Sequence, residues 1–395
     1  MLRKEVKIPE QWCIPCEVEA VTPPKLRKDI IDWCVCTGIT ADRRTAEKAV
    51  DRLNPYMYMK ILFPKLKPDE PLIASQYELN ASVIVTGMDD VLETYTLSAI
   101  EELDHTFKET ENWLLSLPSK DYPDLDAILD HIPTTKPTYS RSVVAMFTDY
   151  FNKYCAAIRA GYKPPDDRLR RFRARLAAAV TAYLEMAKRK RRRDGDLDEE
   201  EFLWQRSADN LSFPVLMLAE VFTGVLANGE IPNTTLHYYH FYSNLFAIVL
   251  NDLNSYHRDR DNDDNSLVKL WLKLGVAEKF EDAAAKTVDF LNSIIVRMYV
   301  AMTENSESHP KSESFRRFRE AVGYTFNGWI LVHTTAVERY KSSPFQTVLS
   351  PVARGAEEAW LKSETAFGKR CVTIFEELIS RRVEEMNKLY GLDST

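Results

Sequence analysis

Apolar residues recur through most of this chain at spacings of three and four, which places them on one face of an α-helix. Runs of alternating apolar and polar residues, which would indicate half-buried strands, are scarce. Proline, glycine and aspartate cluster between the helical stretches, as in Lys163-Pro164-Pro165. The pattern predicts helices over 25–37, 41–53, 72–95, 97–116, 139–161, 167–190, 199–208, 213–227, 234–260, 266–274, 279–304, 312–340 and 355–390.

The glycine content favours an all-α fold. The 395 residues include only 12 glycines, whereas barrels and doubly wound sheets use glycine in many of their tight turns. The sequence has no GxGxxG or GxxxxGK[ST] phosphate-binding motif and no GxSxG nucleophile motif. Because no internal repeat or long flexible linker divides the chain, we expect one domain over 1–395, with an N-terminal segment over 1–24.

The charge balance argues against nucleic acid as the main partner. The chain has 52 basic and 59 acidic residues, a formal net charge of −7. No stretch approaches the roughly 20 apolar residues needed to cross a bilayer, and the first residues lack the apolar run of a signal peptide. We therefore expect a cytoplasmic protein without stable membrane insertion.

The most biased segment joins a basic run, 188–193, to an acidic run that ends at Glu201. A nuclear address or an anionic-surface patch is one interpretation, but the acidic run would neutralise most of the basic charge within a Debye length of ~8–10 Å. We therefore predict a solvated, charged surface loop over 188–201.

Four cysteines are crowded near the start of the chain, as Cys13-x-x-Cys16 and Cys34-x-Cys36. This spacing superficially resembles a zinc ribbon. The second pair lies in a predicted helix, where residues two apart point to different faces and cannot easily hold one ion. Thiols packed as small apolar side chains are the favoured interpretation, and the role of this cluster stays open.

One predicted helix carries three oxygen-bearing side chains at successive four-residue spacings. They are Asn251, Ser255 and Asp259, and on a helix they share one face. An amide, a hydroxyl and a carboxylate together form an all-oxygen site, which a hard divalent cation such as Mg²⁺ prefers.

A second acidic group lies 162 residues earlier, in the helix predicted over 72–95. Asp89, Asp90 and Glu93 are three or four residues apart and can reach one patch. Taken alone, these carboxylates would be interpreted as a solvated face. Paired with the other helix, they indicate two facing metal sites. Such sites suit a substrate diphosphate, because several cations are needed to bind its negative charge and to stabilise it as a leaving group.

Asp89-Asp90-x-x-Glu93 followed by Asn251-Asp252-x-x-Ser255-x-x-x-Asp259 resembles the paired metal motifs of class I terpene synthases, the single-domain microbial-type cyclases. The resemblance extends to other positions in the same order along the chain. They are Arg206, Asp209 and Asn210, similar to the family's sensor, linker and effector group, and Trp329 with Glu338-Arg339-Tyr340, similar to its aromatic wall residue and terminal Arg-Tyr pair.

Three positions depart from the family pattern. Glu93 replaces the commoner Asp and Asp259 the commoner Glu, so each carboxylate is kept but moves by one methylene. Asn210 stands where the family often has Gly, and Asn tolerates unusual backbone angles better than most residues. In overall character the chain looks most similar to the diterpene cyclases of octocorals.

The resemblance implies an all-α, single-domain helical bundle with its active site opening at one end. It also implies three Mg²⁺ ions, two on the Asp89/Asp90/Glu93 side and one on the Asn251 side. Arg206, Arg339 and Tyr340 would bind the diphosphate, an allylic prenyl diphosphate would ionise and cyclise, and diphosphate would be released. The protein would be a monomer or a homodimer. Trp329 would stabilise the carbocation, with filling of the core as its alternative role.

The length of the substrate depends on the depth of the cavity. Val85 and Ser82 lie one and two turns before Asp89, where many cyclases of this family for shorter substrates place bulky aromatic residues. These small side chains favour geranylgeranyl diphosphate. A sesquiterpene cyclase acting on farnesyl diphosphate is the alternative, and a non-catalytic helical interaction protein is a less favoured one.

Overall fold

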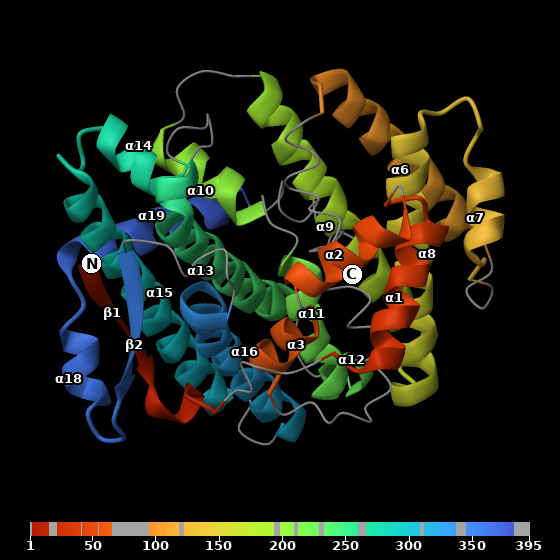
Figure 1. Cartoon of the computed structure of the whole chain (residues 1–395). Coiled ribbons are helices and arrows are strands. Elements are labelled where there is room, and N and C mark those ends of the chain that lie inside the picture. The colour runs from red at the N-terminus through yellow and green to blue at the C-terminus, as the bar shows by residue number, and fades with distance from the viewer. Residues whose placement is uncertain are drawn as a thin grey trace.

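The computed structural model describes residues 2–15, 22–40, 42–53, 55–64, 95–117, 122–192, 198–208, 212–228, 233–259, 266–308, 312–336 and 345–382. Over these residues, helices pack around a central helix, and a pair of strands lies at one side (Figure 1). The elements in chain order are β1 (Leu2–Pro9), η1 (Glu10–Trp12), α1 (Pro24–Cys36), α2 (Arg43–Leu53), α3 (Pro55–Leu62), α6 (Leu97–Ser116), α7 (Leu125–His131), α8 (Thr138–Tyr162), α9 (Asp166–Arg192), α10 (Glu199–Ala208), α11 (Ser212–Phe222), α12 (Val225–Asn228), α13 (Asn233–Asp259), α14 (Leu267–Lys273), α15 (Phe280–Ser308), α16 (Glu313–Leu331), the π-helix η2 (Val332–Ala336), β2 (Phe345–Val352), α18 (Glu357–Lys362) and α19 (Ala366–Arg381).

The central helix is α13. Every side chain from 239 to 250 is buried. Most of these residues are apolar, and Leu245–Leu250 is apolar on all faces, so this helix requires other helices around it. Its neighbours are α10, α11, α14, α15 and α16. Figure 1 shows α13 crossing the middle of the molecule beside α15 and α16. The prediction of an all-α class is confirmed.

Most helix predictions agree with the structure within a few residues, and the ranges 97–116 and 199–208 agree fully. The range 213–227 instead divides into α11 and α12 at Gly224, whose φ of +87° requires glycine. The range 355–390 divides into α18 and α19, where Thr365 caps the second helix by accepting a hydrogen bond from the Gly368 amide at 3.1 Å. The short helices α3 and α7 were not predicted, and the range 72–95 is largely outside the described residues.

Two parallel strands were also not predicted. β1 pairs with β2 in register from Leu2 with Phe345 to Pro9 with Val352. Val6 and Ile8 are fully buried, and Trp12 packs against Gly323 of α16, where an added Cβ would lie 2.6 Å from the indole. The eight-residue strand alternates only weakly, and its partner is near the other end of the chain, so local pattern gives little sign of the pairing.

The prediction of a charged surface loop over 188–201 is wrong at both ends. Residues 188–192 form the last turn of α9, and α10 begins at Glu199. Lys188 is only 8% exposed because its ammonium lies 3.0 Å from the Asp104 carboxylate of α6. Basic residues at the end of a helix and acidic residues at the start of the next one complement the helix dipoles, so this charge pattern stabilises two helix termini.

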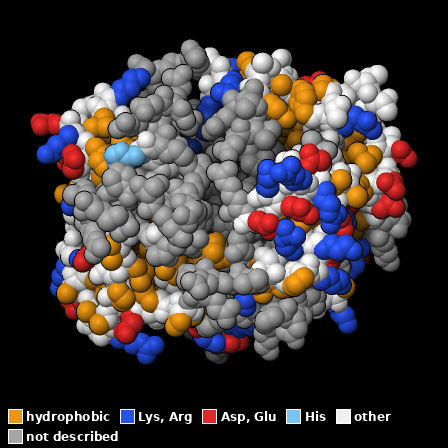
Figure 2. Space-filling view, in the orientation of Figure 1, with side chains coloured by type: hydrophobic (Ala, Val, Ile, Leu, Met, Phe, Trp, Pro, Cys, Tyr) orange, Lys and Arg blue, Asp and Glu red, His pale blue; other side chains and the backbone are white. Residues whose placement is uncertain are grey.

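On the face shown in Figure 2, basic and acidic side chains intermix where Figure 1 places α1 and α2. Arg27 and Asp51 are 2.8 Å apart, and Arg43 pairs with Asp32 at 2.5 Å. Ion pairs between α1 and α2 thus contribute to this mixed surface. Among the described helices, none is long and apolar enough to span a membrane.

Candidate active site

Two of the three oxygen-bearing residues predicted on one helix face lie together near the C-terminal end of α13. Asn251 is half-buried and Ser255 is buried, one helical turn apart. Asp259 is the last residue of the helix, and its side chain lies outside the described residues. The helix predicted over 234–260 is confirmed as 233–259, so the spacing that places these residues on one face holds.

Arg206 reaches the same turn of α13 from α10. Its guanidinium donates a hydrogen bond to the Asp252 carboxylate, and both side chains are buried. The other Asp252 oxygen accepts from the Leu267 amide at the start of α14, at 2.9 Å. Sequence analysis did not assign a role to Asp252, although a carboxylate that closely follows the apolar run 245–250 was a usable signal.

The electrostatic setting of Asp252 is unusual. Burial raises its pKa, and this effect outweighs the opposing influence of Arg206, the Leu267 amide and the more distant Lys190. Asn244, two turns earlier on α13, donates to the Ser207 carbonyl. The end of α10 is therefore held against α13 by both a charged and a neutral hydrogen bond.

Trp329 lies on α16 and is 7% exposed, next to the helix end. The predicted helix 312–340 stops at Leu331 and continues as the π-helix η2, a geometry frequent at functional sites. Within η2, His333 is buried, and its Nδ1 lies 2.8 Å from the Trp329 carbonyl oxygen. Burial lowers the pKa of His333 to about 4, so its ring is neutral near pH 7. Sequence analysis did not identify this histidine.

Several predicted site residues lie outside the described part of the chain, so the structure neither joins nor separates them. They are Ser82, Val85, Asp89, Asp90, Glu93, Asp209, Asn210, Glu338, Arg339 and Tyr340. Among the described residues there is no cluster of three or more histidines, cysteines or carboxylates that could hold a metal ion. The described half of the predicted metal site is therefore Asn251 and Ser255.

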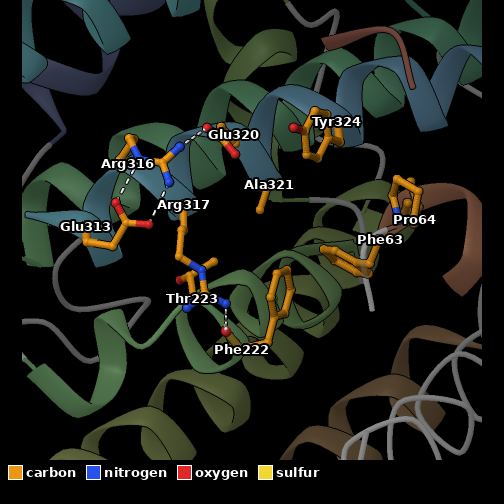
Figure 3. Close-up of a pocket in the computed structure, with 11 residues that line it drawn as sticks. Phe63, Pro64, Phe222, Thr223, Glu313, Arg316, Arg317, Glu320, Ala321 and Tyr324 are labelled. Atoms are coloured by element: carbon orange, nitrogen blue, oxygen red, sulfur yellow. Dashed lines mark hydrogen bonds and ion pairs between the residues drawn. The ribbon is translucent and has the colours of Figure 1, made fainter. Parts of the chain in front are cut away.

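A pocket of about 250 Å³ lies elsewhere, among α3, α11 and α16 (Figure 3). Its walls combine apolar residues such as Phe63 and Phe222 with Arg316, which is already paired with Glu313 at 2.6 Å. The pocket is level with the start of α13, because α13 and α16 run in the same direction, with Tyr239 beside Phe318 and Phe246 beside Phe326. It therefore lies at the opposite end of this helix pair from Asn251.

The thiols near the start of the chain are not arranged around one ion where they are described. Cys34 is buried and Cys36 is exposed, as expected for helix residues two apart. Burial raises the pKa of the Cys34 thiol to about 12 and that of Cys13 to about 11. Both are therefore protonated and unreactive near neutral pH. Cys16 lies outside the described residues.

Comparison with known proteins gives one family match. The profile of terpene synthase family 2, for its C-terminal metal-binding part, matches residues 81–295, more than half of the chain. This range includes the segments of both predicted metal motifs and Arg206. A comparison with curated protein sequences gave no match.

Several solved structures share the fold. Linalool/nerolidol synthase from Streptomyces clavuligerus in complex with 2-fluorogeranyl diphosphate is 17% identical, with a TM-score of 0.53 over 80% of this chain and 97% of the other. 2-Methylisoborneol synthase from Streptomyces coelicolor A3(2), with Mg²⁺ and 2-fluoroneryl diphosphate, is 18% identical, with a TM-score of 0.54 over 85% and 98%. Aristolochene synthase from Penicillium roqueforti is 13% identical, with a TM-score of 0.52 over 81% and 96%.

Proposed function

The chain belongs to terpene synthase family 2, and from this premise we propose that it is a class I terpene cyclase that ionises an allylic prenyl diphosphate and releases diphosphate. The observation that carries the proposal is the buried Arg206 against the turn of α13 that presents Asn251. A permanently charged, planar guanidinium suits diphosphate oxygens, and its place beside an amide and a hydroxyl at i, i+4 suits a metal–diphosphate complex.

The described donors fit magnesium. The amide oxygen of Asn251 and the hydroxyl of Ser255 are hard, neutral oxygen ligands on one helix face. We propose that Asp259 completes this set and that Asp89, Asp90 and Glu93 supply the other, for three ions in all. Two structures with this fold were solved with prenyl diphosphate analogues, one of them also with Mg²⁺. Bound Mg²⁺ would stabilise the negative charge of the departing diphosphate.

The protein residues would have separate tasks. Arg206, Arg339 and the Tyr340 hydroxyl would donate hydrogen bonds to the diphosphate oxygens, with Asp209 and Asn210 as the linker and effector beside the sensor. Trp329 would stabilise the carbocation by a cation–π contact of ~1–2 kcal/mol in the absence of water. His333, which is neutral near pH 7, would add no positive charge close to that wall.

We further propose that the substrate is geranylgeranyl diphosphate, because Ser82 and Val85 leave depth below the acidic motif. Each additional buried methylene-sized group contributes ~0.8 kcal/mol, so a pocket that admits the one additional five-carbon isoprene unit of the C20 substrate should prefer that substrate. Farnesyl diphosphate is the alternative substrate. The whole chain is proposed to act as one catalytic domain, a carbon–oxygen lyase acting in the cytoplasm.

The test is diphosphate release from geranyl, farnesyl and geranylgeranyl diphosphate, each with Mg²⁺ and with excess EDTA, with product analysis in parallel. Mg²⁺-dependent cyclic products would support the proposal. Absence of release with all three substrates would refute it and favour a non-catalytic helical protein. A kcat/KM that is higher for the C15 than for the C20 substrate would refute the substrate assignment alone, and Ser82→Phe should move that ratio toward the C15 substrate.

A further inference from the structure

Three basic residues in the last turn of α9, Lys188, Arg189 and Arg191, contact the two segments that flank the proposed diphosphate site. We propose that these three residues, here called the bracket, are positioning residues. They keep the acidic motif before α6 and the helix α10, which carries Arg206, at a fixed distance from each other. The inference rests on the proposed function. Figure 1 shows α9 running between α10 and α6, and both helices pack against it.

The first arm of the bracket reaches α6. The Lys188 ammonium lies 3.0 Å from the Asp104 carboxylate, and the two side chains are only 9% and 7% exposed. Arg191 donates its Nε hydrogen to the Tyr95 carbonyl oxygen at 3.1 Å. Tyr95 follows Glu93, the last residue of the acidic motif, by two positions. The bracket therefore holds the backbone immediately after the proposed metal ligands.

The second arm reaches α10. Arg189 donates to a Glu201 carboxylate oxygen at 3.1 Å, and Gln205 donates to the same oxygen at 3.2 Å. Gln205 directly precedes Arg206 in the helix. The same turn of α9 thus contacts the helix that carries Arg206.

A simpler interpretation is that these cations complement the helix dipole and otherwise face solvent. That interpretation suits Arg192, whose pair with Glu101 is largely exposed, because exposed pairs contribute little. It does not account for Lys188, whose ammonium is removed from water between two helices and depends on its carboxylate partner. Since Lys188, Arg189 and Arg191 lie within one turn of one helix, the two arms are joined by a rigid element.

The experiment compares two lysines that share one carboxylate. Lys188 and Lys108 both contact the same Asp104 oxygen, but Lys108 lies on α6 itself and bridges nothing to α9. We expect Lys188→Met to raise the Mg²⁺ concentration for half-maximal rate and to lower kcat/KM by about tenfold or more, because displacements near 1 Å have effects of this size. Lys108→Met should stay within about twofold of wild type, and Lys188→Arg should restore most of the loss.

Arg191→Met and Arg192→Met repeat the comparison at exposed positions, where loss of folding is not expected, so the bracket is tested even if Lys188→Met does not fold. Arg191→Met should show the higher Mg²⁺ requirement and Arg192→Met should not. Equal losses in Lys188→Met and Lys108→Met, or a wild-type Mg²⁺ requirement in folded Arg191→Met, would overturn the bracket.

Calorimetric titration of each variant with inorganic diphosphate in MgCl₂ separates this inference from the proposed function. If the wild type binds Mg²⁺ and diphosphate but turns over no prenyl diphosphate, the cyclase proposal fails while the bracket is still tested through affinity. Weaker binding in Lys188→Met and Arg191→Met than in their controls supports the bracket. Unchanged binding in both refutes it.

Discussion

Two buried arginine–carboxylate pairs contact α13, and the charges of their carboxylates are compensated to different degrees. Glu220 of α11 receives two hydrogen bonds from Arg175 of α9 and lies 2.6 Å from His240 of α13. Burial alone would raise the pKa of Glu220, but these two partners outweigh it and hold the pKa well below its usual range. At the other end of the helix, burial keeps the pKa of Asp252 raised in spite of Arg206.

From this difference we predict that the Arg175–Glu220 pair is structural and that the Arg206–Asp252 pair serves the proposed site. His240 and Asp252 are 12 residues apart on α13, so the two pairs lie roughly 18 Å apart at 1.5 Å per residue. The Glu220 pair lies within the core, with both carboxylate oxygens hydrogen-bonded and His240 against the Phe318 ring. The Asp252 pair is incompletely compensated and lies beside the proposed metal ligands, and such perturbed groups concentrate at functional sites.

The largest expected effect is a loss of turnover at the C-terminal end of α13, where the proposed metal ligands lie. Asn251→Ala should reduce turnover by at least about 10³-fold while the melting temperature stays close to wild type, because the residue is a half-buried proposed metal ligand and not a core contact. The control is Asn254→Ala, since the Asn254 amide bonds the Leu250 carbonyl of its own helix at 2.8 Å. Comparable turnover in the two variants would remove the metal role from Asn251.

Disrupting the Arg175–Glu220 pair should lower the stability of the protein and leave its turnover largely unchanged. Arg175→Met leaves the Glu220 carboxylate buried without its main partner and should lower the free energy of unfolding by about 3–5 kcal/mol, measured by urea denaturation. The folded fraction should retain a kcat near that of wild type. A stable Arg175→Met variant with a severely reduced kcat would show that the two pairs are not distinct in role.

Arg206→Lys should reduce turnover much more than stability, the reverse of what is expected for Arg175→Met. A lysine keeps the charge against Asp252 but cannot reproduce planar, bidentate recognition of phosphate, so kcat/KM should fall by about 10²-fold. The free energy of unfolding should change much less than in Arg175→Met. A fully active lysine variant would exclude Arg206 as the diphosphate sensor.

Trp329 should give a smaller change. Trp329→Leu removes the aromatic face and should lower kcat by roughly 5- to 30-fold, equivalent to ~1–2 kcal/mol of lost cation–π stabilisation. Trp329→Phe keeps an aromatic face and should lose less. If both variants lose stability equally and neither changes kcat or the product distribution, filling of the core is the role of Trp329.

The pH dependence of stability gives the smallest effect. Because the folded pKa of Glu220 lies below its ordinary value of 4.5, its stabilising contribution is complete above that value and is lost as the pH falls toward the folded pKa. Below pH 4.5 the contribution of the Glu220 carboxylate to the difference in unfolding free energy between wild type and Glu220→Gln should therefore shrink by at most about 1.4 kcal/mol per pH unit. A carboxylate contribution that grows below pH 4.5 would contradict the lowered pKa.

The sequence predicted the parts of this molecule that depend on local periodicity. The helix bearing Asn251 and Ser255 was predicted within one residue at each end, because the apolar pattern of α13 is strong and continuous. The pairing of Arg206 with Asp252 was not predicted, since it depends on how two helices separated by 46 positions pack. The basic run at Lys188 was misinterpreted for the same reason, because its partner Asp104 lies on a helix 84 residues earlier. The roles of the acidic motif and of Arg339 and Tyr340 stay predictions.

The parallel pairing of β1 with β2 has a consequence for how the chain folds. Leu2 pairs with Phe345, so β1 cannot form its ladder until β2, more than 330 residues later in the chain, has been synthesised. Contacts at such long sequence separation form slowly, because the entropy of closing the loop opposes them. Until that pairing forms, β1 presents unpaired backbone groups, and unpaired strand edges are prone to associate with other chains.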